Sequence, residues 1–298
     1  MPTLIKHIFT VRVLVVCICI SAVLSFYLGL VPFSTCEKQE TGVHKNNVRE
    51  VMITAAPAHR LAVIVPHRDR FEELLEFIPH VSKFLHNQGV HFRIYVINQA
   101  DNLRFNRASL VNIGYLISQK ECDYIAMHDV DLLPLNPKLN YSYPEAGPYH
   151  VAAPQLHPLY HYPTFVGGIL LMRGDHFRKV NGLSNKYWGW GKEDDEFYVR
   201  MKQADLQIFR PGDIGSGPTD TFKHVHDRVK RKRDRIRYLD QKKISRQRDY
   251  VTGIDTLKYE EISRYKLTVE DAVATVVNVK LECDMAETPW CIHLNTKQ

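Results

Sequence analysis

An alternation of strand-like and helix-like segments constrains the fold of this 298-residue chain more than any other feature. Short apolar runs predict buried strands, and the segments between them carry apolar residues at the spacing of a helix. The predicted strands are 61–66, 92–98 and 123–127, and the predicted helices are 106–120 and 71–87, in which Pro79 should cause a kink or a break. Such units with short connections favour an α/β fold with a Rossmann-like, mostly parallel sheet flanked by helices.

Two carboxylates follow the third predicted strand, in the tripeptide Asp129-Val-Asp131. Residues just beyond the carboxyl end of a parallel strand face the ligand crevice of an α/β sheet. Two carboxylates there repel each other unless a cation lies beside them. The tripeptide therefore favours a divalent metal that holds a phosphorylated substrate, although such a sequence also occurs in loops where it only caps or solvates.

Arginines follow the other predicted strands. The first loop reads Pro66-His-Arg-Asp-Arg70 and contains no dinucleotide-binding glycine fingerprint, and Arg107 lies at the next crossing. A guanidinium group suits bidentate contact with phosphate. Each arginine alone is typical of a surface ion pair, whereas Arg68, Arg70 and Arg107 together indicate a phosphate-binding crevice.

The middle of the chain indicates a sugar site. Tyr160-His-Tyr162 and two adjacent glycines precede an apolar strand at 169–172, and such glycines let the backbone approach a ligand closely. Further on, the tryptophans of Trp188-Gly-Trp-Gly191 form a flat apolar platform on a mobile backbone. The four acids of 193–196 then open a predicted helix. Capping and the helix dipole account for one or two of them, so one is a candidate general base.

The segment His224-Val-His226 predicts the second half of the metal site. Alternate residues of an extended segment share a face, so both imidazoles can reach one ion. Together with Asp131 they provide a mixed oxygen and nitrogen set that suits Mn²⁺, with Zn²⁺ or Co²⁺ as alternatives.

The N-terminal segment predicts a membrane anchor. Residues 13–33 are almost uninterruptedly apolar, and a segment of this length can cross a bilayer as a helix. Basic residues precede this segment. We expect a cytosolic tail at 1–12, a transmembrane signal-anchor at 13–33, a stem at 34–60 and a lumenal catalytic domain at 61–298. A cleaved signal peptide is the alternative. In an oxidising lumen, Cys283 and Cys291 can form a disulfide.

The net charge of +6 is unevenly distributed. Residues 230–248 hold ten Lys or Arg and two Asp, a net of +8, so the rest of the chain sums to −2. One interpretation is a solvated helix face. The other is an anionic partner such as an acidic glycan or a nucleotide diphosphate; nucleic acid is not expected in a lumen.

Several motifs appear together and in order, and they give the chain a family resemblance. Asp129-Val-Asp131, Phe165-Val-Gly-Gly168, Trp188-Gly-Trp-Gly-Lys-Glu-Asp-Asp195 and His224-Val-His226 resemble those of the β-1,4-galactosyltransferases. The resemblance extends from residue 61 to about 290, and Tyr160-His-Tyr162 is similar to the members that act on xylose. It implies a GT-A fold, UDP-galactose as donor, Mn²⁺, and an inverting transfer to O4 of xylose on a serine of a proteoglycan core protein. It also implies a single-pass type II protein of the Golgi membrane.

The resemblance also implies residue roles. Asp131, His224 and His226 would hold manganese, and Asp194 would be the catalytic base. The implied substrate-binding residues are Pro66, Arg68, Arg70, Arg107, Asp129, Tyr160, Tyr162, Phe165, Gly168, Trp190, Glu193 and Asp195.

Two departures from the family pattern bear on specificity. His67 replaces the usual aromatic residue after the proline, and Phe165 stands where the family usually has Tyr. Phe165 keeps the bulk that excludes an N-acetyl group, so galactose remains favoured. The alternatives are a same-fold transferase that uses UDP-N-acetylgalactosamine or another acceptor, and a non-catalytic glycan-binding protein.

Overall fold

The computed structural model describes residues 58–293 of the chain. The predicted tail, the signal-anchor and all but the last three residues of the predicted stem lie outside this range. Within 58–293, no helix has the length and apolar character needed to span a membrane.

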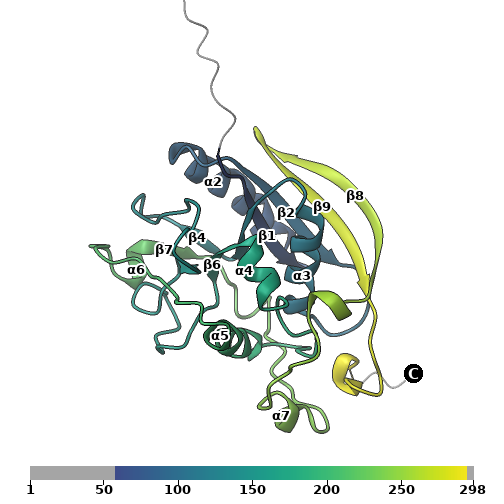
Figure 1. Cartoon of the computed structure of the whole chain (residues 1–298). Coiled ribbons are helices and arrows are strands. Elements are labelled where there is room, and N and C mark those ends of the chain that lie inside the picture. Colours follow the sequence, from purple (N-terminus) through teal and green to yellow (C-terminus); the bar gives the residue numbers. More distant parts are fainter. Residues whose placement is uncertain (1–57, 294–298) are drawn as a thin grey trace, which may run out of the picture. The chain divides into compact units, whose positions relative to one another are not determined.

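A seven-stranded sheet with the order β5-β6-β3-β1-β2-β9-β8 forms the centre of the described structure (Figure 1). Its strands are β1 (Leu61–His67), β2 (Phe92–Gln99), β3 (Tyr124–His128), β5 (Tyr149–His150), β6 (Ile169–Arg173), β8 (Tyr259–Val269) and β9 (Ala272–Leu281). A separate two-stranded sheet pairs β4 (Leu132–Pro134) with β7 (Phe222–His224).

The large sheet is mixed, so the prediction of a mostly parallel sheet is correct only for its centre. The pairs β1–β2, β1–β3 and β2–β9 are parallel, whereas β3–β6, β5–β6 and β8–β9 are antiparallel. The strand β6 arrives from a long loop without a crossover helix, and an antiparallel neighbour needs none. The β8–β9 hairpin, which was not predicted, turns at Glu270 with a φ of 52°.

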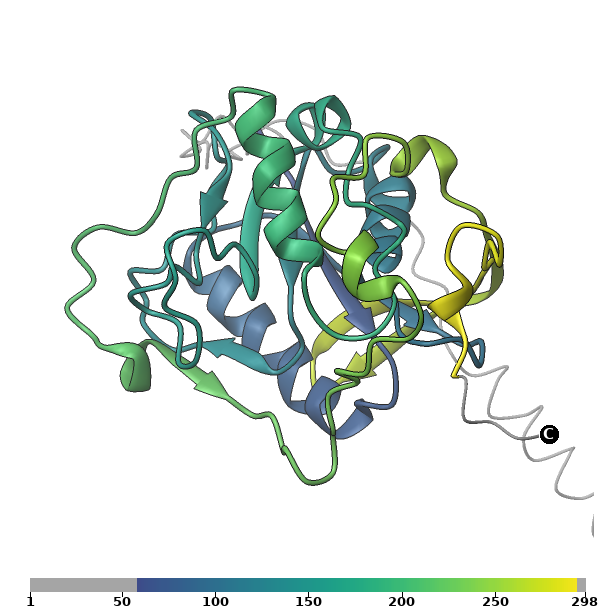
Figure 2. The same cartoon turned by 90° about the horizontal axis from the view of Figure 1, so that it is seen from below.

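Helices cover both faces of the sheet. The helix α2 (Phe71–Asn87) lies on one face, and α3 (Arg107–Ser118), α4 (Gly174–Lys179) and α5 (Glu193–Gln203) lie on the other (Figure 2). Side chains of β1 alternate between them: Val63 joins the core under α2, and Ile64 joins the core under α3. Burial on both faces explains why these strands read as continuous apolar runs.

The helix α2 runs unbroken through Pro79, so the predicted break is wrong. Its buried residues continue on both sides of the proline, from Leu74 and Phe77 to Val81 and Leu85. Packing of both halves against the sheet outweighs the one backbone hydrogen bond that proline cannot make.

The remaining elements are short. They are α6 (Pro218–Thr221), α7 (Gln241–Ile244) and the 3-10 turns Ile254–Thr256 and Pro289–Cys291. The basic run 230–248 is therefore mostly loop, and its interpretation as one solvated helix face is wrong.

Candidate active site

A cleft with a volume of about 1120 Å³ opens at the carboxyl ends of β1 and β3. This is spacious for the site of one small molecule. Every predicted site residue lines the cleft except His226, whose side chain is only 2% exposed. The first turn of α5 and the basic segment 230–237 close it from the other side.

The pairing of β4 with β7 brings the predicted metal ligands together. Leu132 pairs with His224, and the Val225 N–H donates to the Asp131 carbonyl over 2.9 Å. The Asp131 carboxylate and His226 Nδ1 are 3.1 Å apart, and the rings of His224 and His226 are stacked with centres 5.7 Å apart. This small sheet thus joins a carboxylate and two imidazoles that are far apart in the sequence.

Arg70 lies between two of these groups. Its Nη1 donates to Asp131 Oδ2 and contacts His226 Nδ1, each at 3.0 Å. Among the described residues, no three His, Cys, Asp or Glu side chains converge as a ready metal site. In this arrangement the positive charge beside Asp131 comes from Arg70.

The donor chemistry nevertheless fits a divalent metal. Burial by itself would raise the pKa of Asp131, but the hydrogen bond with His226 and the charge of Arg70 lower it to about 2. Burial lowers the pKa of His224. An ionised carboxylate and neutral imidazoles are the forms that bind metal, and this mixed set suits Mn²⁺.

Arg107 organises the acids on the opposite wall. It holds Asp129 at 2.7 Å and lies 3.9 Å from Glu193, although Glu193 Oε2 is buried without a hydrogen-bond partner in the described structure. Burial opposes the charge on Arg107, but the two carboxylates raise its pKa overall. Asp129 and Arg107 therefore neutralise each other in this arrangement.

Asp194 differs from the other acids in the first turn of α5 in its charged neighbours. Lys192 pairs with Asp195 at 2.9 Å and Arg200 with Glu196 at 2.8 Å, whereas Asp194 forms no ion pair within residues 58–293. Burial, followed by the charges of Glu193 and Asp195, raises the pKa of Asp194 to about 7. A carboxylate with this pKa is suited to act as a general base near neutral pH.

Gly167 contributes to the cleft and was not among the predicted site residues. A Cβ at this position would lie 2.7 Å from Phe165 Cε2 and 3.0 Å from Asp194 Oδ2. The neighbouring Gly168 accepts a hydrogen bond from the Asp129 N–H over 2.9 Å. The glycine pair therefore keeps open the space between the carboxylate turn after β3 and the candidate base. The sequence carries a signal for this position, namely the pair of adjacent glycines before the strand at 169–172.

Aromatic rings form another part of the cleft wall. The ring of Tyr160 is 5.1 Å from Phe165 and 6.4 Å from Trp190, and Tyr162 is 5.5 Å from Phe165. The Tyr160 hydroxyl is buried without a hydrogen-bond partner among the described residues, so it is available to a ligand. His157, also missed by sequence reasoning, supports this wall by accepting from the Tyr160 N–H.

The guanidinium of Arg68 is held by protein contacts that the sequence did not indicate. Its Nη1 donates to the Leu103 carbonyl over 2.7 Å, and its guanidinium lies 5.3 Å from the ring centre of Phe105. With Pro66 it lines the end of the cleft next to β1.

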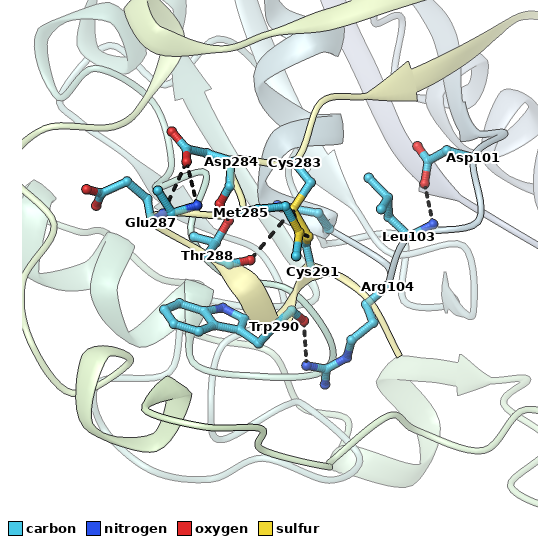
Figure 3. Close-up of a disulfide and its surroundings, with 12 residues drawn as sticks. Asp101, Leu103, Arg104, Cys283, Asp284, Met285, Glu287, Thr288, Trp290 and Cys291 are labelled. Atoms are coloured by element: carbon cyan, nitrogen blue, oxygen red, sulfur yellow. Dashed lines mark hydrogen bonds between the residues drawn. A yellow bond between two sulfur atoms is a disulfide. The ribbon is translucent and has the colours of Figure 1, made fainter. Parts of the chain in front are cut away.

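Arg104 is a structural residue that sequence reasoning did not identify. It is fully buried and donates to Asp234, Gln241 and the carbonyls of Ile236 and Trp290. The disulfide between Cys283 and Cys291 closes the turn that carries Trp290 (Figure 3).

Arg104 also explains one glycine of the tryptophan loop. A Cβ at Gly189 would lie 2.1 Å from Arg104 Nη2, and Gly189 has a φ of 82°. This arginine thus ties the tryptophan loop, the basic segment and the C-terminal turn together.

Sugar transfer from a nucleotide needs positive charge for the diphosphate and a base for the acceptor hydroxyl. The cleft places groups of both kinds at the carboxyl edge of one sheet. Fold and cleft together define a nucleotide-sugar glycosyltransferase of the GT-A type.

Comparisons with known proteins give the family. The model of the N-terminal region of glycosyl transferase group 7 matches residues 30–144, and that of the N-terminal domain of galactosyltransferase matches 147–227. Human β-1,4-galactosyltransferase 7 is 57% identical over 78% of this chain and 71% of its own length. The xylosylprotein 4-β-galactosyltransferase of Caenorhabditis elegans is 49% identical over 78% of this chain and 82% of its own.

A solved structure agrees with these matches. The catalytic domain of Drosophila β-1,4-galactosyltransferase 7 in complex with xylobiose is 53% identical, with a TM-score of 0.78 over 79% of this chain and 99% of that one. A mutant of the same enzyme, in complex with manganese, UDP-Gal and xylobiose, has a TM-score of 0.77. The chain belongs to the β-1,4-galactosyltransferase family, glycosyl transferase group 7.

Proposed function

We propose that this protein transfers galactose from UDP-galactose to O4 of xylose on a serine of a proteoglycan core protein, with manganese and with inversion. The observation that carries the proposal is Asp194, an acid without a cation partner among the described residues and with a pKa raised to about 7, in the cleft that holds Asp131 and His224. The relatives named for this activity, and the one bound to manganese, UDP-Gal and xylobiose, support it.

The residues of the cleft divide the work. Asp131, His224 and His226 would hold manganese, which when bound stabilises the negative charge of the diphosphate leaving group. Arg70, which now contacts Asp131, would turn its guanidinium to the phosphates. Asp194 takes the proton of the xylose O4 hydroxyl as that oxygen attacks the anomeric carbon from the opposite face. One displacement inverts the centre and requires no enzyme nucleophile.

Phe165 supports galactose as the donor sugar. Its ring is buried and held among His150, His157, Tyr160 and Tyr162, with ring centres 4.9–5.5 Å away. A ring fixed in this way leaves little room for an N-acetyl group. A transferase for UDP-N-acetylgalactosamine would need a smaller residue here, and a glycan-binding protein would need no base at Asp194.

We further propose that the catalytic domain is lumenal and that residues 13–33 anchor it in the Golgi membrane. The apolar length of this segment and the disulfide of the folded domain support that location, because disulfides persist in oxidising compartments.

Turnover by the full-length protein tests the function. UDP-galactose and a β-xyloside should give a β-1,4-linked galactosyl-xylose that depends on added Mn²⁺. UDP-N-acetylgalactosamine should give much less product, and Phe165→Ala should increase turnover with this donor. Equal turnover of both donors by the unaltered protein would contradict the donor assignment.

A further inference from the structure

The basic segment 230–237 carries cations that form no ion pair with a carboxylate of residues 58–293, and three of them contact Trp190. Lys230 and Arg231 pair with Glu72, and Arg231 also pairs with Glu73 at 3.1 Å. In contrast, within residues 58–293, no carboxylate forms an ion pair with Lys232, Arg233, Arg235 or Arg237. The segment thus divides into a neutralised part and a free part.

The free part is held against the exposed tryptophan of the cleft. The guanidinium carbons of Arg233 and Arg235 lie 4.9 and 4.8 Å from the Trp190 ring centre, and Arg237 donates to the Trp190 carbonyl over 2.6 Å. The backbone N–H of Trp190 donates to the Asp234 carbonyl over 2.7 Å. These contacts therefore hold the arginines beside the ring.

Trp190 lies at an exposed part of the cleft lining, on the loop that leads into the candidate base. Trp190 is 37% exposed and stands four residues before Asp194, whose carboxylate must reach the attacking hydroxyl. If xylose lies between the candidate base and the tryptophan, the peptide that carries it leaves the cleft past Arg233 and Arg235. This step rests on the proposed function.

We propose that Lys232, Arg233, Arg235 and Arg237 form an acceptor rim that selects xylosylated peptides with acidic side chains next to the modified serine. Unpaired cations at the mouth of a cleft attract an anionic partner over long range and then pair with it. Galactosylation of acidic acceptors is consequently faster than that of neutral acceptors at the same xylose.

Two xylosylated peptides of equal length test the rim, one with glutamates and one with glutamines beside the serine. The full-length protein should favour the acidic peptide in kcat/KM by about tenfold at low salt. This preference should fall toward unity near physiological ionic strength, where the Debye length is about 8 Å.

Matched variants locate the effect. The pair Arg233→Gln and Arg235→Gln should abolish the preference, and Arg233→Lys with Arg235→Lys should keep most of it. The pair Lys242→Gln and Lys243→Gln removes the same charge from exposed positions outside the cleft and should leave the preference unchanged.

Three results would overturn the rim. The first is equal kcat/KM for both peptides at low salt. The second is a preference that survives Arg233→Gln with Arg235→Gln. The third is that this double variant only loses affinity for UDP-galactose, to the same extent with both peptides. If neither peptide is galactosylated, the proposed function fails. Binding of the two fluorescent peptides to the protein then decides the rim separately, and equal dissociation constants would reject it.

Discussion

The guanidinium of Arg70 lies 3.0 Å from the carboxylate of Asp131, and Asp131 is a residue that would bind the metal. The same Nη1 is 3.0 Å from His226 Nδ1, so one cation serves two of the three predicted ligands. A divalent metal and this guanidinium compete for the same electron pairs. If Asp131 and His226 bind the metal as proposed, Arg70 would have to turn away, and it would then be free for a diphosphate.

Removal of this competing charge should change metal affinity and donor affinity in opposite directions. In the absence of nucleotide, Arg70→Met should bind Mn²⁺ about tenfold more tightly, a gain of about 1.4 kcal/mol. Its KM for UDP-galactose should rise. Titration calorimetry with Mn²⁺ alone measures the first effect, and a weaker or unchanged affinity would show that Arg70 does not compete.

The candidate base gives a second prediction. Asp194→Asn should retain Mn²⁺ and UDP binding but lower turnover by roughly 10²–10⁴-fold, the usual contribution of a general base. Binding of UDP by calorimetry and single-turnover rates separate the two effects. Near-normal turnover would transfer the role to Glu193 or Asp195.

The raised pKa of Asp194 predicts the pH dependence. Only the ionised carboxylate accepts a proton, so kcat should rise with pH through about 7 and level off above it. The negative charge of Glu193 contributes to this raised pKa, so Glu193→Gln should move the acidic limb to lower pH. A pH profile of kcat for both proteins checks this, and coincident midpoints would exclude Glu193 as a cause.

Each predicted histidine ligand can be tested by metal titration. His224→Ala or His226→Ala should raise the Mn²⁺ concentration for half-maximal rate by about tenfold or more, since each removes one of three protein ligands. His176→Ala, on α4 away from the cleft, serves as the control. Titration curves that superimpose on that of the unaltered protein would make the histidines structural.

Arg104 predicts a large effect on stability. Arg104→Met should lower the free energy of unfolding by about 3–5 kcal/mol, because it leaves Asp234 and buried carbonyl groups without a partner. Arg173→Met, which breaks an exposed pair with Asp175 and an exposed hydrogen bond to the Glu145 carbonyl, should cost about 1 kcal/mol or less. Urea unfolding compares the two, and equal losses would contradict a central role for Arg104.

Much of the fold could be predicted because local periodicity encodes it. The runs that became β1, β2 and β3 are mostly apolar, and α2 shows its buried stripe directly in the sequence. The carboxylates after β3 and the tryptophan–glycine segment before α5 were recognisable for a related reason. The residues of each motif stand close together in the chain, so their types and spacing can be read directly.

Pairings between distant segments were not predictable in this way. The antiparallel direction of β6 and the addition of β9 beside β2 depend on which sheet edge is free, and no local pattern carries that information. The same holds for β4 with β7, which places His224 beside the turn that carries Asp131.

The sequence by itself determined the kinds of groups in the site: acids after β3, imidazoles at 224 and 226, surplus acids at the start of α5 and a basic run beyond them. Only the tertiary structure decided which charges remain free. It pairs Arg107 with Asp129, Arg70 with Asp131 and Arg231 with Glu73, and leaves Arg233 and Arg235 against Trp190. The reason is physical: a charge is neutralised by whatever lies within a few ångströms, and chain folding, not sequence distance, sets that neighbourhood.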